Sequence, residues 1–124
     1  MIQFLAVFLG GGFGCIARYQ TNLYFLSRNQ LGSFPTGTFV ANVVGCLLIG
    51  IFAGISEKYT LPKEINLFIV PGLLGGFTTF SAFGLETFSF LKRGEPRLAF
   101  IYGFSSVLFG VFAVLLGFFA TKKL

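Results

Sequence analysis

The sequence predicts an all-α membrane protein with four transmembrane helices, a break in the third helix and assembly as an antiparallel dimer. Three observations predict this fold class: the composition, the spacing of apolar stretches and the placement of basic residues. Of the 124 residues, 55% are hydrophobic and only 10% are charged, and the mean hydropathy is +0.86. With so few polar residues, a domain of this length cannot present a water-compatible surface. We therefore expect the bilayer to be its solvent.

Four apolar stretches are long enough to cross a bilayer, which takes about 20 residues. We expect spans at residues 2–26, 36–56, 64–91 and 98–121, joined by short loops into a single four-helix domain over residues 1–124. Proline stands at the start of the second, third and fourth spans, where its missing N–H costs no hydrogen bond. No Lys or Arg precedes the first apolar run, which exceeds the usual signal length, so we expect a retained helix.

The third span carries the strongest functional signal, the run Gly75-Gly76-Phe77-Thr78-Thr79-Phe80-Ser81-Ala82-Phe83. Pro71 and the glycines weaken the helix here, and we expect a helix to resume after Thr79. Non-helical backbone at membrane depth is tolerated only where protein or an aqueous cavity satisfies it. The break therefore predicts a buried site for an ion or a polar solute, and transport becomes the leading functional class.

Basic residues are balanced between the two sides of the predicted helices. One side carries four and the other side also carries four, while Arg18 lies inside the first span; the two sets are Lys58, Lys63, Lys122, Lys123 and Arg28, Lys92, Arg93, Arg97. Loop Lys and Arg normally mark the cytoplasmic side, so an even split predicts insertion in both orientations and pairing as an antiparallel dimer. Weak bias in a short-looped protein is the alternative explanation.

Several other classes of function find no support. The net charge is +5, but the basic residues form no run or aromatic-interleaved patch, so we expect no nucleic-acid partner. Cys15 and Cys46 lie in apolar spans without paired spacing, which predicts buried free thiols with no metal or redox role. The chain has no His, no acid pair and no nucleophile beside a base, so an enzyme is not expected.

The first two spans combine small residues with one polar side chain. Small residues recur at four-residue spacing, which favours close helix packing within the subunit and across a dimer: Gly10 with Gly14, Ala41 with Gly45, and Gly50 with Gly54. Asn42 must find a partner or line water, because its amide lies in an apolar helix. It either bonds to a neighbouring helix or donates to an anion beside the broken third span.

Phe80 and Phe83 lie three residues apart and so share one face of the helix that follows the break. Such a pair is usually packing. The chain, however, has nineteen Phe and no Trp, and a phenyl edge carries partial positive charge that can face an anion without gripping it. Conduction requires that compromise.

Three motifs in order resemble a known family, the small dual-topology fluoride channels called Fluc or CrcB. The run from Gly75 to Phe83 resembles the GGxTTFSxF signature of that family. Gly11-Gly12-Phe13-Gly14-Cys15-Ile16-Ala17-Arg18-Tyr19 resembles its first-helix GGxxGxxxRY motif, and Asn42 with Gly45 resembles its NxxG element. The resemblance covers all four spans.

The resemblance implies an antiparallel homodimer with two fluoride pores, each built from both subunits. Phe80 and Phe83 would line the pores, and Asn42 would donate to fluoride. The backbone carbonyls of Gly75 and Thr78 would hold a central, structural sodium ion. The hydroxyls of Thr79 and Ser81 would lie nearby.

The resemblance also assigns roles to residues outside the break. Arg18 would face a vestibule, with extension to the lipid headgroups as the alternative. Glu86 would border the fluoride path, or else partner a polar group near the helix end. Tyr102 and Ser106 fit a polar track on the fourth helix. Gly110 and Val114 depart from that track, so one competent pore or a related second subunit remains an alternative.

The implied function is passive export of cytoplasmic fluoride across a bacterial plasma or inner membrane. Two alternatives stay open. A small proton-coupled drug exporter shares the size and the charge balance, and Glu86 would be its proton carrier. A subunit that only completes the pore of another chain would conduct nothing alone.

Overall fold

The computed structural model describes residues 1–28 and 32–123, and within these ranges every element is helical. The elements are α1 (Ile2–Arg28), α2 (Thr36–Lys58), α3 (Lys63–Leu67), the π-helical segment η1 (Phe68–Leu74), α4 (Gly75–Phe77), α5 (Phe80–Lys92) and α6 (Pro96–Lys122). Taken end to end, α3 to α5 form one span, and this span and the three long helices are apolar enough to cross a membrane. The predicted spans are confirmed to within two residues at each end.

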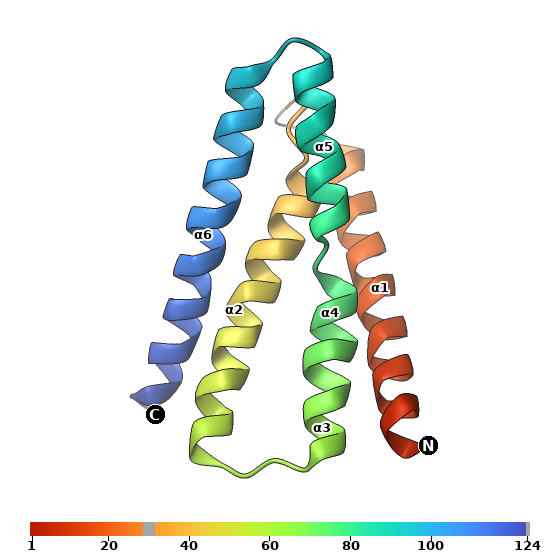
Figure 1. Ribbon diagram of the computed structural model, residues 1–124, viewed down its shortest axis with the longest axis vertical. Helices are drawn as coiled ribbons and strands as arrows, with labels where there is room; N and C mark the ends of the chain where they lie inside the picture. The colour runs from red at the N-terminus through yellow and green to blue at the C-terminus, as the bar shows by residue number, and fades with distance from the viewer. Residues whose placement is uncertain (29–31, 124) are drawn as a thin grey trace.

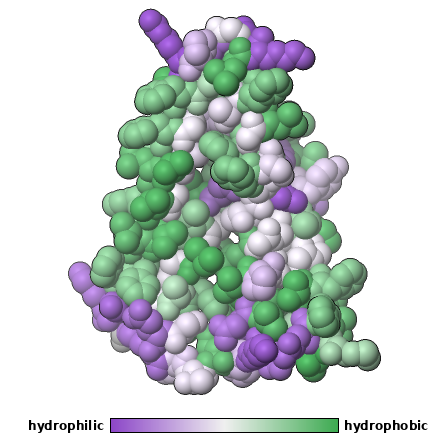
Figure 2. All heavy atoms as spheres, viewed as in Figure 1, coloured by the Kyte–Doolittle hydropathy of each residue, from purple (hydrophilic) through white to green (hydrophobic). Residues whose placement is uncertain are grey.

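The four spans alternate in direction (Figure 1). Both termini and the α2–α3 connection lie at one end, and the α5–α6 connection lies at the other. Helix α1 packs along the first half of the third span, whereas α2 and α6 lie side by side over most of their length. Figure 2 shows hydrophilic residues gathered at the two ends of the molecule, with a hydrophobic band between them. The band agrees with the four helical spans, which are each long and apolar enough to cross a bilayer.

The third span adjusts to Pro71 without breaking there. Pro71 has no N–H and would crowd the carbonyl four residues earlier in an α-helix. The backbone widens instead into π-helical η1 around Pro71, and the helix continues to Phe77. The interruption falls at Thr78 and Thr79, and α5 begins at Phe80 as predicted.

Glycines set how closely the helices approach. A Cβ atom at Gly10 would overlap the carbonyl oxygen of Phe68, and one at Gly14 would overlap that of Leu73. On the other side of the molecule, a Cβ atom at Gly50 would overlap the carbonyl oxygen of Val114. The prediction that small residues pack the helices within the subunit is therefore confirmed.

The two cysteines differ in exposure, and neither forms a disulfide. Cys46 is half-buried, but Cys15 is exposed. The prediction of two buried thiols is wrong for Cys15, because Gly14 takes the tightly packed position against the third span and Cys15, about 100° further round the helix, stays exposed in the single subunit.

Replacing Gly50 with Ala should destabilise the subunit by about 1–3 kcal/mol, the usual cost of overpacking. The new methyl group has no room beside Val114. The matched control is Gly103→Ala on α6, where the nearest atom would be a Phe83 ring carbon at 4.0 Å. Thermal loss of helical circular dichroism should move to lower temperature for Gly50→Ala only. Equal melting of both variants would contradict the packing described here.

Candidate functional site

Two extended residues interrupt the third span at mid-membrane. Thr78 has φ −83° and ψ 157°, and Thr79 has φ −151° and ψ 116°. Both sets of angles lie in the extended region, so the hydrogen-bond ladder of the helix stops between α4 and α5. The polar groups that the ladder would have joined must find other partners.

The side-chain amide of Asn42 supplies two of those partners. Asn42 Nδ2 donates to the carbonyl oxygen of Thr79 at 3.1 Å, and the Thr79 N–H donates to Asn42 Oδ1 at 2.7 Å. The amide thus pairs with the backbone as a neighbouring strand would. Of the two roles the sequence left open for Asn42, the interhelical hydrogen bond is therefore formed. Donation to an anion, the role the sequence favoured, stays a prediction, and Nδ2 carries a second N–H beyond the one used here.

The break also frees backbone carbonyls by diverting their donors. In an unbroken helix the Thr79 N–H would donate to the Gly75 carbonyl, but here it donates to Asn42. The Ala82 N–H would donate to the Thr78 carbonyl, but it donates at 3.3 Å to Thr79 Oγ1, which caps α5. Thr79 therefore frees both carbonyls: its N–H leaves the Gly75 carbonyl unbonded, and its hydroxyl takes the N–H that would have bonded the Thr78 carbonyl.

Arg18 reaches the break from α1. Its Nη1 donates to the Thr78 carbonyl oxygen at 3.2 Å, and its Nη2 lies 3.7 Å from Cys15 Sγ. The guanidinium is turned toward the third span, not extended to the headgroups. Neither of the two ion pairs formed between described residues includes Arg18. Its charge is balanced only by a backbone dipole and by the medium.

A cavity of about 300 Å³ lies beside the break, between α2 and the third span. Its walls combine groups from both elements, among them Asn42, Gly45, Cys46, Gly75, Thr78 and Phe80. Within the single subunit Gly75 is exposed, and the residue Phe80 is 83% exposed. The cavity is thus mostly apolar, with polar groups from Asn42, Thr78 and Thr79 in its wall, and the subunit alone does not cover it.

Aromatic rings lead away from this cavity along α5. The Phe80 and Phe83 ring centroids are 5.6 Å apart, and those of Phe83 and Tyr102 are 5.2 Å apart. The predicted sharing of one face by the two Phe rings is confirmed. Tyr102 is completely buried, and its hydroxyl donates to Glu86 Oε2 at 2.6 Å. The rings therefore connect the break to a carboxylate one helix turn further along α5.

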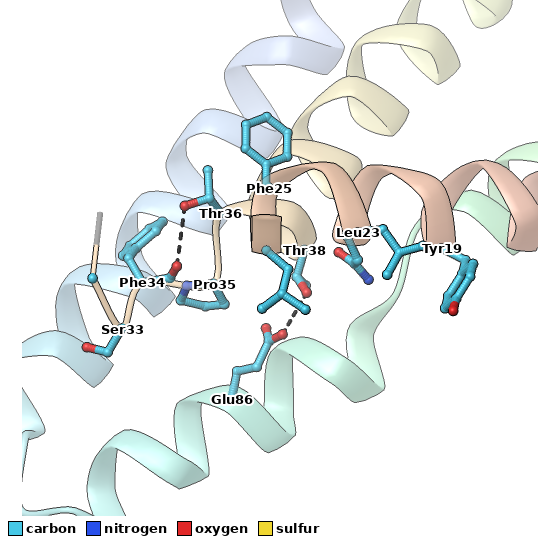
Figure 3. Close-up of a pocket in the computed structure, with 12 residues that line it drawn as sticks. Tyr19, Leu23, Phe25, Ser33, Phe34, Pro35, Thr36, Thr38 and Glu86 are labelled. Atoms are coloured by element: carbon cyan, nitrogen blue, oxygen red, sulfur yellow. Dashed lines mark hydrogen bonds between the residues drawn. The ribbon is translucent and has the colours of Figure 1, made fainter. Parts of the chain in front are cut away.

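Glu86 receives a second hydroxyl from α2, because Thr38 Oγ1 donates to its Oε1 at 2.6 Å. Figure 3 shows Thr38 and Glu86 facing each other at the wall of a second cavity, of about 510 Å³. Helix α1, the start of α2 and the chain before it form the rest of this cavity, with polar groups from Tyr19, Asn22, Ser33 and Thr36. Sequence reasoning missed Thr38. Its position four residues before Asn42, on the same helix face, was the available signal.

The polar track on α6 stops after Ser106. Ser106 Oγ is fully buried and, among the residues the structure describes, is the one such side-chain atom without a hydrogen-bond partner. At the next two turns the helix serves packing instead. A Cβ atom at Gly110 would lie 3.4 Å from Cys46 Sγ, and the Val114 backbone abuts Gly50. Close contact with α2 thus explains the missing side chain at Gly110, whereas nothing in the structure explains the missing hydroxyl at Val114.

The structure brings the predicted residues together in two groups. Arg18, Asn42 and Thr78 meet at the break, where Thr79 Oγ1 also lies 3.3 Å from Ser81 Oγ. Phe83, Tyr102 and Glu86 form the second group, and Phe80 links the two.

Comparison with known proteins places this chain in a family. The family model described as CrcB-like protein, Camphor Resistance (CrcB), matches residues 5–118. A protein of Bacteroides fragilis is 42% identical over 119 residues, covering 94% of each chain. Proteins of Desulfotalea psychrophila and Nitrobacter winogradskyi are 43% and 45% identical, covering 96% and 91% of this chain and 91% and 90% of their own. All three are named fluoride-specific ion channel FluC. The chain therefore belongs to the CrcB-like family.

Proposed function

We propose that this chain is a fluoride-selective channel, which releases cytoplasmic fluoride passively through two pores at the interface of an antiparallel dimer. The observation that carries the proposal is the mid-membrane break, held open by Asn42 beside a cavity and continued by a row of aromatic rings. Relatives at 42–45% identity that are named fluoride-specific channels support the choice of ion. A passive channel needs no energy source from the chain.

The groups along the proposed path bind an anion weakly. Asn42 lines the cavity and has a second N–H beyond the one given to Thr79, and the edges of Phe80 and Phe83 carry partial positive charge. Beyond them lies the Ser106 hydroxyl, which is buried and without a partner among the described residues, whereas the Tyr102 hydroxyl already donates its proton to Glu86. None of these groups is a full cation, so an ion can enter and also leave.

A second copy of the chain would complete the path. Lipid does not satisfy the polar groups of a broken helix, yet Gly75 and Phe80 are exposed in one subunit. An antiparallel copy would cover this wall with its own equivalent, and the even distribution of basic residues suits insertion in both orientations. A related second subunit is the alternative, because Gly110 and Val114 give the α6 track no hydroxyl beyond Ser106.

The same dimer would bring four freed carbonyls together, from Gly75 and Thr78 of each subunit. Unwound backbone carbonyls are the ligands that membrane proteins offer to sodium, and both carbonyls have lost their helical donors here. Four carbonyl oxygens therefore fit a structural sodium ion as ligands. Bound there, the cation would offset carbonyl dipoles that otherwise repel an anion.

The purified chain alone should release fluoride from liposomes rapidly, with little chloride release measured in parallel. A fluoride electrode records efflux after a potassium shunt opens the electrical path. Absence of efflux from protein that crosslinks as a dimer would contradict the homodimeric channel and direct the search to a second subunit.

Replacing Phe83 with Leu should slow fluoride efflux about tenfold or more, because it removes a ring edge between the break and Tyr102. Leu keeps an apolar side chain of similar bulk. Phe4→Leu is the matched control, since Phe4 is 83% exposed near the start of α1. Equal efflux from the two variants would contradict the proposal that the aromatic rings line the fluoride path.

Glu86→Gln should leave a fluoride current whose reversal potential follows the fluoride gradient alone. The amide still offers an oxygen to Thr38, and a channel moves no coupled proton. With equal fluoride on both sides of a planar bilayer and a proton gradient across it, both the wild type and the variant should reverse at zero voltage. A wild-type reversal potential that shifts with the proton gradient, and a variant that loses this shift, would favour a proton-coupled exporter.

A further inference from the structure

The guanidinium of Arg18 and the proposed sodium ion have the same acceptor. Arg18 Nη1 donates to the Thr78 carbonyl oxygen at 3.2 Å, and that carbonyl is one of the two whose helical donors are diverted. Of the Gly75 and Thr78 carbonyls, the Thr78 carbonyl is therefore the one that the Arg18 cation already contacts. The inference below rests on the sodium site of the proposed function.

Two cations at one carbonyl repel each other strongly in this position. A carbonyl oxygen has two lone pairs, so geometry alone permits both contacts. Arg18, however, is part-buried, and its guanidinium forms neither of the ion pairs found in the described part of the chain. Because neither ion pair neutralises it and it is half-buried, the charge of Arg18 is screened less than that of a fully solvated side chain and repels a cation at Thr78.

We propose that Arg18 is a positioning residue that occupies the Thr78 carbonyl in the single subunit and must be displaced for sodium to bind there. Before a partner subunit binds, the guanidinium satisfies a freed carbonyl at membrane depth. Without it, that carbonyl would be exposed to lipid. Sodium, which needs carbonyls from both subunits, replaces it only on assembly. Arg18 thereby couples occupancy of the sodium site to dimer formation and lowers the apparent affinity for sodium.

A purely structural role for Arg18 predicts the opposite sign. If the guanidinium merely braced the Thr78 carbonyl in its binding orientation, its removal would loosen the site and weaken sodium binding. Competition predicts that its removal strengthens sodium binding. The direction of the change therefore separates the two roles, and loss of transport alone does not.

The test measures how sodium stabilises the purified dimer in detergent. Melting temperature is recorded against sodium concentration, with N-methylglucamine replacing sodium at constant ionic strength, and the half-saturating concentration is read from the curve. For Arg18→Met it should fall about tenfold, a typical size for coupling between two sites. Arg18→Lys keeps the charge with a shorter reach and should lie between Met and the wild type. Arg28→Met is the matched control, because Arg28 stacks on Tyr24 at the end of α1 and should change nothing.

Each outcome decides the proposal. Unchanged or weaker sodium binding in Arg18→Met overturns it, and if that variant does not fold, the direction of the Arg18→Lys shift decides. If the melting temperature of the wild-type dimer does not depend on sodium, both the sodium site and this inference are contradicted. Fluoride efflux from wild-type liposomes reports separately on the channel, so failure of the inference and failure of the proposed function remain distinguishable.

Discussion

The pairing between the Asn42 amide and the backbone of Thr79 is the interaction on which the rest of the site depends. A helix interrupted at membrane depth exposes N–H and C=O groups that lipid leaves unsatisfied. The Asn42 side chain forms a hydrogen bond with the Thr79 N–H and another with the Thr79 C=O. Because it takes the Thr79 N–H, the Gly75 carbonyl is released, and because Thr79 stays extended, its hydroxyl is free to cap α5 and release the Thr78 carbonyl.

Helix α2 holds both the break and the hairpin of α5 and α6, and a single ridge of residues does so. Successive positions four residues apart rotate by about 40° around a helix. The ridge on α2 therefore turns gradually from the third span to α6. Its members and their contacts follow in order: Thr38 to Glu86, Asn42 to Thr79, Cys46 to Gly110, Gly50 to Val114 and Gly54 to Thr121. Polar contacts at one end thus give way to close steric packing at the other, and the α6 track loses its hydroxyls in this packed region.

Sequence reasoning predicted the spans, the break and the helix restart because these depend on local composition and on backbone rules. Residues 75–83 carry their own signal, and the small residues of α1 and α2 announce close packing. The orientation of long side chains depends on how each helix is rotated against its neighbours, which no local pattern states. The approach of Arg18 to Thr78, the exposure of Cys15 and the partnership of Thr38 with Glu86 are of that kind. The π-helical detour at Pro71 likewise depends on how the neighbouring turns adapt.

Hydrogen exchange at the Thr79 amide, measured by NMR in micelles, tests the central claim most directly. If Asn42 holds the break, the Thr79 amide is protected in the wild type and exchanges about tenfold faster or more in Asn42→Ala. The control Asn66→Ala removes an amide that bonds to the Leu61 and Pro62 carbonyls at the start of the span, and Thr79 should be unaffected. Equal protection of Thr79 in the wild type and in Asn42→Ala would contradict the account, because the break would then be held by other groups.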